Sequence, residues 1–252
     1  MLQPLCTVRS CALPLAREER RYVCANHHSF DIARSGYCNL LQPQDKRSKE
    51  PGDARAAVEA RRRFFDRGFA KGLQRGLKEM LPHFESVLDV GCGEGSHLAA
   101  MASGDDAIGI DISTSAIDLA AKAYCGNRWF VANADRFIPF PDRSFDLILS
   151  ITGRMNAPEF QRVLREDGHL LIAVSARDDL IEIGGAGRDR VTRTIETFRD
   201  FSIIDQRRIA TVVDLDDEAA TDILAATYRP RQAKAARVTL SLDALLFRNP
   251  KP

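Results

Sequence analysis

The chain has 252 residues, which is enough for one full α/β domain and a small additional module. Its formal net charge is only +1, so a nucleic-acid partner would have to bind a local basic patch. No apolar run reaches the length of a membrane span, and the N-terminus lacks the layout of a signal peptide. We therefore expect a cytoplasmic protein without a membrane partner.

Three of the six cysteines cluster with a histidine near the N-terminus. Four residues separate Cys6 from Cys11, and twelve separate Cys11 from Cys24. His28 follows Cys24 after three more residues. Three thiolates and one imidazole make the closed tetrahedral shell of a structural zinc ion, which would hold together a segment too short to bury its own core. His27 is an alternative fourth ligand, and free cysteines without a metal are an alternative to the site.

A polar, turn-rich connector at residues 45–53 precedes a predicted helix over residues 53–81. Asp53 can cap this helix, and five apolar residues share one stripe at helical spacing: Val58, Phe65, Phe69, Leu73 and Leu77. The connector and the opposite helix face are basic, with Lys46, Arg47, Lys49, Arg55, Arg61, Arg62, Arg63, Arg67, Lys71 and Arg75. Either they form a phosphate-binding surface or they are a solvated face. The neighbouring zinc module favours RNA binding.

An apolar run over residues 86–90 predicts a buried strand that stops at a glycine-rich turn. Gly91, Gly93 and Gly95 allow positive φ and lack a Cβ, so a ligand can contact bare backbone N–H groups. The next predicted strand, residues 107–110, leads into Asp111, an acid placed to bind ribose hydroxyls. The glycine spacing differs from the Gly-x-Gly-x-x-Gly of nicotinamide-binding turns. S-adenosylmethionine (SAM) is therefore favoured as cofactor, with a plain strand-to-helix turn as the alternative.

A third strand-like run ends at residues 133–135 and extends the same predicted edge. The residues expected to bind SAM are Asp89, Gly91, Cys92, Gly93, Gly95, Ser96, Asp111, Ile112, Asn133, Ala134 and Asp135.

The alternation of elements predicts an α/β fold with a largely parallel, doubly wound, Rossmann-like sheet of the SAM-methyltransferase type. Strands are expected at residues 86–90, 107–110, 128–132, 145–150, 168–174, 207–213 and 237–247. A helix at residues 217–226 separates the last two strands, which should form an antiparallel edge. We expect a zinc-binding RNA-recognition module at residues 1–44, a basic connector and helix at 45–82, and a SAM-dependent methyltransferase domain at 83–252.

Several short motifs are distributed along the chain: Cys24-Ala25-Asn26 with His28, Ser29-Phe30-Asp31, Gly36-Tyr37, Asn39-Leu40-Leu41, Lys46-Arg47-Ser48, Pro51-Gly52-Asp53, Arg61-Arg62 with Phe64, Asp66 and Gly68, and the run from Val87 to Gly95. Together they resemble the RlmA family of large-subunit rRNA guanine-N1 methyltransferases, which includes the tylosin-resistance methyltransferase. The similarity covers nearly the whole chain. It implies an N-terminal zinc module that binds RNA, a SAM domain, a homodimer, a hairpin of 23S rRNA as substrate, and a possible link to antibiotic resistance.

Four departures from the family pattern cluster around the expected methyl-transfer site. The family's Gly-His-Tyr is replaced by Gly68-Phe69-Ala70, and Ser96-His97 follows the glycine turn in place of a pair that ends in tyrosine. The aromatic-Ala-Pro after the fourth strand becomes Thr152-Gly153-Arg154, and His-Leu-x-Glu-Leu becomes Asp179-Leu180-Ile181-Glu182-Ile183. The changes indicate either a different target or binding without catalysis.

Methyl transfer is an in-line displacement, so an enzyme supplies alignment and an electrostatic field rather than a covalent nucleophile. Guanine N1 must also lose a proton. Asp179 and Asp135 are the acids expected near the site, and Asp135 is better suited to the adenine amino group, so no base is assigned. Arg154 is expected to stabilise charge on guanine O6 or to contact a phosphate. The alternatives are a methyltransferase for another RNA or a small molecule, and an inactive RNA-binding relative.

Overall fold

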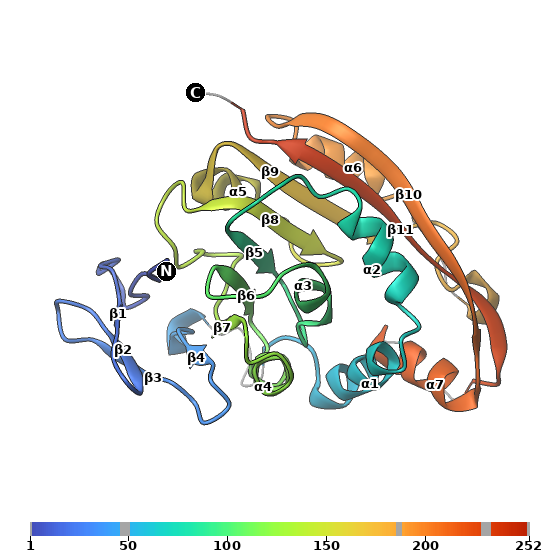
Figure 1. Ribbon diagram of the computed structural model, residues 1–252, viewed down its shortest axis with the longest axis horizontal. Helices are drawn as coiled ribbons and strands as arrows, with labels where there is room; N and C mark the ends of the chain where they lie inside the picture. The colour runs from blue at the N-terminus through green and yellow to red at the C-terminus, as the bar shows by residue number, and fades with distance from the viewer. Residues whose placement is uncertain (1, 46–50, 185–187, 228–232, 251–252) are drawn as a thin grey trace.

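The computed structural model describes residues 2–45, 51–184, 188–227 and 233–250. In these residues one mixed sheet runs through the molecule, in the order β10-β11-β9-β8-β5-β6-β7-β4 (Figure 1). Neighbouring strands from β9 to β4 pair in parallel, whereas β11 pairs antiparallel with both β9 and β10. The strands are β4 (Cys38–Asn39), β5 (Val87–Val90), β6 (Ala107–Asp111), β7 (Arg128–Val131), β8 (Phe145–Ile151), β9 (Leu164–Ser175), β10 (Ser202–Leu215) and β11 (Ala236–Arg248).

Helices cover both faces of this sheet. The helices are α1 (Arg55–Asp66), α2 (Lys71–Lys78), α3 (Ser96–Met101), α4 (Thr114–Ala123), α5 (Ala157–Val163), α6 (Val191–Thr197) and α7 (Asp217–Ala226). Side chains of α1 to α4 and α7 share one core with Val87 and Leu147, and those of α5 and α6 share the other with Leu88 and Ile148. Neighbouring residues of a strand point to opposite faces of the sheet. A strand that is buried on both faces therefore has a continuous apolar sequence.

The predicted fold is confirmed. Each expected strand is present, and α7 covers the expected residues 217–226. Asp216 caps this helix by accepting a 2.9 Å hydrogen bond from the backbone of Ala219. β9 and β10 begin earlier than expected, at Leu164 and Ser202.

The single helix expected over residues 53–81 is wrong, because the structure contains two helices there. Gly68 ends α1 with a φ of 81° and donates from its backbone N–H to Phe65 O at 2.8 Å. A left-handed glycine is a common helix terminator. The break could not be recognised from the apolar stripe, because the stripe continues past Gly68. Asp53 is also not the cap: Ala54 holds that position, and Asp53 pairs with Arg61.

The apolar stripe of this segment is buried only in part. Val58, Leu73 and Leu77 lie in the core as expected, whereas Phe65 and Phe69 are half-buried. Phe64 is the aromatic residue of α1 that is fully buried.

The N-terminal segment forms a three-stranded antiparallel sheet from β1 (Ala16–Arg17), β2 (Arg21–Val23) and β3 (Ser29–Asp31). In Figure 1 this sheet lies at the left of the molecule, next to β4. It also contacts β7, because the Tyr22 and Phe130 rings are 5.7 Å apart. β4 then continues the main sheet by pairing with β7. The segment therefore shares its core with the larger domain. Two short 3-10 helices lie at Pro43–Asp45 and Ile181–Ile183.

None of the helices in the described part of the chain is both long and apolar enough to cross a membrane.

Candidate functional site

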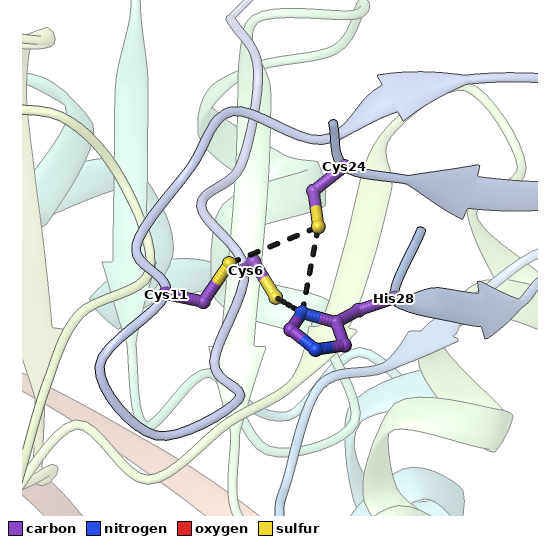
Figure 2. A group of neighbouring side chains, drawn as sticks. All are labelled: Cys6, Cys11, Cys24 and His28. Atoms are coloured by element: carbon purple, nitrogen blue, oxygen red, sulfur yellow. Dashed lines mark hydrogen bonds between the residues drawn. The ribbon is translucent and has the colours of Figure 1, made fainter. Parts of the chain in front are cut away.

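The four predicted metal ligands converge at one point of the N-terminal module (Figure 2). The ligand atoms of Cys6, Cys11, Cys24 and His28 all lie within 4.8 Å of one another. Cys11 Sγ is 3.8 Å from Cys24 Sγ, and His28 Nδ1 is 3.4 Å from Cys6 Sγ and 3.5 Å from Cys24 Sγ.

These distances fit a tetrahedral zinc site. With Zn–S bonds of about 2.3 Å and Zn–N bonds of about 2.0 Å, the edges of the tetrahedron measure roughly 3.5 to 3.8 Å. His27, the alternative ligand, is exposed and does not belong to the cluster. It adopts a φ of 59° inside the turn in which its N–H donates to Cys24 O. That turn directs the ring of His28, rather than that of His27, toward the thiols.

The glycine turn borders a cavity of about 690 Å³ at the carboxyl ends of β5, β6, β7 and β8. Gly91, Gly93 and Gly95 have φ values of 75°, 57° and 82°. Gly91 and Gly93 line the cavity, whereas a Cβ on Gly95 would lie 2.5 Å from the Trp129 ring. The first two glycines thus keep the ligand space open, and Gly95 permits close packing beneath the turn.

The cavity collects seven of the residues predicted to bind SAM: Gly91, Gly93, Asp111, Ile112, Asn133, Ala134 and Asp135. The other four do not line the cavity: Asp89 lies in β5 before the turn, Cys92 and Gly95 belong to the turn, and Ser96 begins α3. Ser96 Oγ lies 3.2 Å from the hydroxyl oxygen of Tyr124.

Asp111 is held in place by backbone N–H groups. Its Oδ2 accepts from Gly93 N at 3.0 Å, and its Oδ1 accepts from Ser113 N at 2.8 Å. Burial raises the pKa of this carboxyl, and the two backbone hydrogen bonds oppose that effect. Each oxygen has a further lone pair, which suits a pair of ribose hydroxyls.

The residues therefore fit SAM. A volume of about 690 Å³ lies within the usual range of small-molecule sites, roughly 300 to 1,000 Å³. The cavity also brings the hydrogen-bonding groups of Asp111 and Asn133 to the same edge as the open glycine backbone.

Comparisons with known proteins agree with both sites. A family model for the RlmA N-terminal zinc ribbon matches residues 4–49, and a model for a methyltransferase domain matches residues 87–171. The chain is 32% identical over 231 residues to the 23S rRNA (guanine(748)-N(1))-methyltransferase of Streptomyces fradiae, in a match that covers 85% of this chain and 81% of the relative. The chain belongs to the RlmA family.

This RlmA-family chain also matches a second relative in sequence and a solved structure in fold. It is 40% identical over 169 residues to a Bacillus subtilis relative provisionally named as a 23S rRNA (guanine-N(1))-methyltransferase, spanning 58% of that protein and 62% of this chain. A Thermotoga maritima SAM-dependent methyltransferase structure matches with a TM-score of 0.51 at 15% identity, covering 78% of this chain and all of that one. SAM and a structural zinc ion are thus the cofactors of this RlmA-family methyltransferase.

The loop after β8, where the RlmA-family motif is replaced, forms another wall of the cavity. Thr152 has a φ of 53°, which is strained for a β-branched residue. A Cβ on Gly153 would lie 2.6 Å from Val90 O, so only glycine fits there. Arg154 is 79% exposed, and its Nε lies 3.8 Å from Asp135 Oδ2. Arg190, which the sequence did not single out, lines the same cavity.

Asp179 does not line the cavity of the RlmA-family chain. Its carboxylate accepts from Ser241 N at 3.0 Å and so supports the neighbouring β11. Other lining residues also carried no signal in the sequence, among them Ser175, Ala226 and Thr227. Short side chains and backbone groups of this kind show no periodicity or motif that could mark them.

Most arginines of the basic helix are paired within the chain. Arg55 pairs with Glu59, Arg62 with Asp66, Arg63 with Asp222, and Arg67 with Asp216. Among the described residues, Lys71 and Arg75 lie farther than 4.0 Å from any carboxylate oxygen. Lys46, Arg47 and Lys49 lie outside the described residues. The part of the predicted RNA surface that α1 contributes is therefore largely neutralised by acids.

Asp89 beneath the turn is expected to make stability depend on pH. It is buried, its Oδ1 has no hydrogen-bond partner among the described residues, and burial raises its pKa to about 8. The folded state then holds a proton that the unfolded state releases above about pH 4. Stability from this group is present at low pH and is lost as the pH rises toward 8.

We expect Asp89→Asn to remove this slope, which amounts to at most about 1.4 kcal/mol per pH unit. Urea unfolding between pH 5 and pH 9 should show the variant overtaking the wild type in stability at the alkaline end. The exposed Asp200 provides the control, since Asp200→Asn should leave the slope unchanged. Parallel curves for Asp89→Asn and the wild type would show that Asp89 is ionised in the folded state.

Proposed function

We propose that this chain transfers a methyl group from SAM to N1 of a guanine in 23S rRNA. The observation that carries the proposal is the match to the Streptomyces fradiae enzyme, which covers 85% of this chain and 81% of that enzyme. The family models for the zinc ribbon and for the methyltransferase domain support it. The geometry adds a cavity of the right size for the cofactor, and Thr152, Gly153 and Arg154 form one of its walls. We propose the zinc-binding RNA module at residues 1–44, the connector and helix at 45–82, and the methyltransferase domain at 83–252.

The cofactor supplies an electrophilic methyl group, and the protein must orient the acceptor beside it. Guanine N1 becomes nucleophilic when its proton leaves, and negative charge then grows on O6. Arg154 and Arg190 bring two guanidinium groups to the cavity, and a cation at this position favours the deprotonated guanine. The family motif has an apolar residue where this chain has Arg154. The added charge also supports a second candidate function, in which the methyl group is transferred to a different acceptor.

Methylation of rRNA that lacks the modification tests the proposal. Incubation with methyl-labelled SAM should place the label on one guanine of 23S rRNA. Primer extension should stop at that base, because a methyl group on N1 blocks Watson–Crick pairing. Label in tRNA or another RNA would instead support the divergent methyltransferase, and tight SAM binding without any RNA labelling would support the inactive RNA-binding relative.

We further propose that the enzyme acts on a hairpin of the rRNA in the cytoplasm and forms a homodimer. β10 supports the dimer, because it is a long edge strand with three exposed apolar side chains: Ile203, Ile204 and Val212. An edge of this kind offers unpaired backbone groups to a second copy. Light scattering after size exclusion measures the mass, and a monomer at micromolar concentration would contradict the dimer.

A further inference from the structure

Arg61 differs from the other arginines of α1 because its side chain lies over the glycine turn. Its Nη2 donates to Asp53 Oδ2 at 2.7 Å and to Ala226 O at 3.0 Å. Its Nη1 lies 3.4 Å from the position that a Cβ on Gly93 would occupy. The side chain is 24% exposed and lines the cofactor cavity.

This arrangement leaves donors pointing at the ligand space. A guanidinium group has five N–H donors, and Nη2 uses both of its own on Asp53 and Ala226. None of the described residues accepts a hydrogen bond from Nη1 or Nε. Asp53, in the segment before α1, and Ala226, at the end of α7, hold the guanidinium in one orientation, so it is preorganised to bind an anion.

We infer that Arg61 binds the α-carboxylate of the methionine part of SAM, an inference that rests on the methyl transfer proposed above. The carboxylate is the negatively charged group of this cofactor. Asp111 and Asn133 provide hydrogen-bonding groups for the adenosine half. Gly93 N donates to Asp111 Oδ2 at 3.0 Å, so Arg61 above Gly93 lies beside the ribose site, within reach of the methionine half that extends from the ribose. Arg154 lies at another part of the turn, because it follows Gly153, whose Cα would lie 3.2 Å from a Cβ on Gly91.

Arg63 provides a matched control on the same helix. It donates to both carboxylate oxygens of Asp222, at 2.5 and 3.0 Å, and so ties α1 to α7 as Arg61 does. Arg63 does not line the cavity. A loss of helix docking should therefore appear in both variants, whereas a loss of carboxylate binding should appear only at Arg61.

The test measures the affinity of the full chain for two neutral-sulfur ligands by calorimetry. S-adenosylhomocysteine carries the amino-acid part, and 5′-methylthioadenosine shares its adenosine and thioether but lacks that part. We expect Arg61→Gln to weaken S-adenosylhomocysteine binding by about 10- to 100-fold, the range for losing hydrogen bonds to a charged group. Binding of 5′-methylthioadenosine should stay unchanged. Arg61→Lys should recover part of the loss, because it keeps the charge but not the planar fork.

Two outcomes would overturn the inference. Unchanged S-adenosylhomocysteine affinity in Arg61→Gln would show that Arg61 does not bind the ligand. An equal loss for both ligands, or an equal loss in Arg63→Gln, would show that Arg61 acts only by holding α1 against α7. Wild-type protein that binds neither ligand would instead contradict the cofactor site itself, so failure of the proposed function is distinguishable from failure of this inference.

Discussion

Replacing Cys24 with serine is expected to release the zinc ion and unfold the N-terminal module. Cys24 Sγ takes part in two edges of the ligand tetrahedron, at 3.8 Å from Cys11 Sγ and 3.5 Å from His28 Nδ1. Structural zinc contributes on the order of 10 kcal/mol to the folding of small modules, and a serine hydroxyl is a poor substitute for a thiolate. Apart from the zinc ion, the sheet of β1 to β3 is held by its packing on the larger domain, as between Tyr22 and Phe130. Three strands this short are too small to stay ordered by that packing alone, so the sheet should not remain ordered.

Elemental analysis should find about one zinc ion per wild-type chain and none in Cys24→Ser. Limited proteolysis should then cleave the variant within residues 2–36, while the sheet from β4 onward remains protected. Cys125→Ser is the matched control, because Cys125 is exposed and lies outside the cluster. Full zinc content in the variant, or a metal-free wild type with a protected N-terminus, would contradict the assignment.

Gly93→Val is expected to abolish SAM binding. Gly93 has a φ of 57° and lines the cavity, and its Cβ position lies 3.4 Å from Arg61 Nη1. A valine would place two methyl groups in the space of the cofactor. It would also strain the turn by about 1 to 3 kcal/mol, because β-branched residues avoid the left-handed region. The turn would lose both its open space and the orientation of its N–H groups.

Calorimetry with SAM measures the effect, and a thermal melt shows whether the domain remains folded. Gly104→Val is the control that distinguishes backbone strain from loss of space for the ligand. Gly104 also has a positive φ, 120°, but it lies outside the cavity and no other residue lies within 4 Å of its Cβ position. It should lower stability while keeping SAM affinity. Normal SAM affinity in a folded Gly93→Val protein would exclude the turn as the cofactor site.

The parts of the fold that the sequence predicted correctly depend on local patterns. Residues 87–90 and 107–111 are strands because buried parallel strands need continuous apolar runs, and such runs are visible without a structure. The convergence of three cysteines with a histidine could be predicted for a similar reason, since cysteine spacing reflects the reach of a short loop around one ion. His28 rather than His27 was decided by the turn that gives His27 a positive φ.

The roles of the basic residues could not be predicted. Arg61, Arg62 and Arg63 are consecutive, and their sequence neighbourhood is nearly identical. In the folded chain Arg61 lies in the cofactor cavity, Arg62 pairs with Asp66, and Arg63 pairs with Asp222 from a segment 159 residues away. A helix directs adjacent side chains about 100° apart, so their partners depend on which elements pack against each face.

The sequence by itself determined the fold class and located the glycine turn and the cysteine cluster, because each of these is encoded by residues that are close together along the chain. Only the tertiary structure decided that Asp89 lies beneath the turn, that Asp179 supports β11, and that Arg61 lines the cavity. These positions arise where β5, β11 and α7 meet segments distant in sequence. Contacts across such distances depend on how the sheet twists and how its helices pack, so they cannot be predicted from a local sequence pattern.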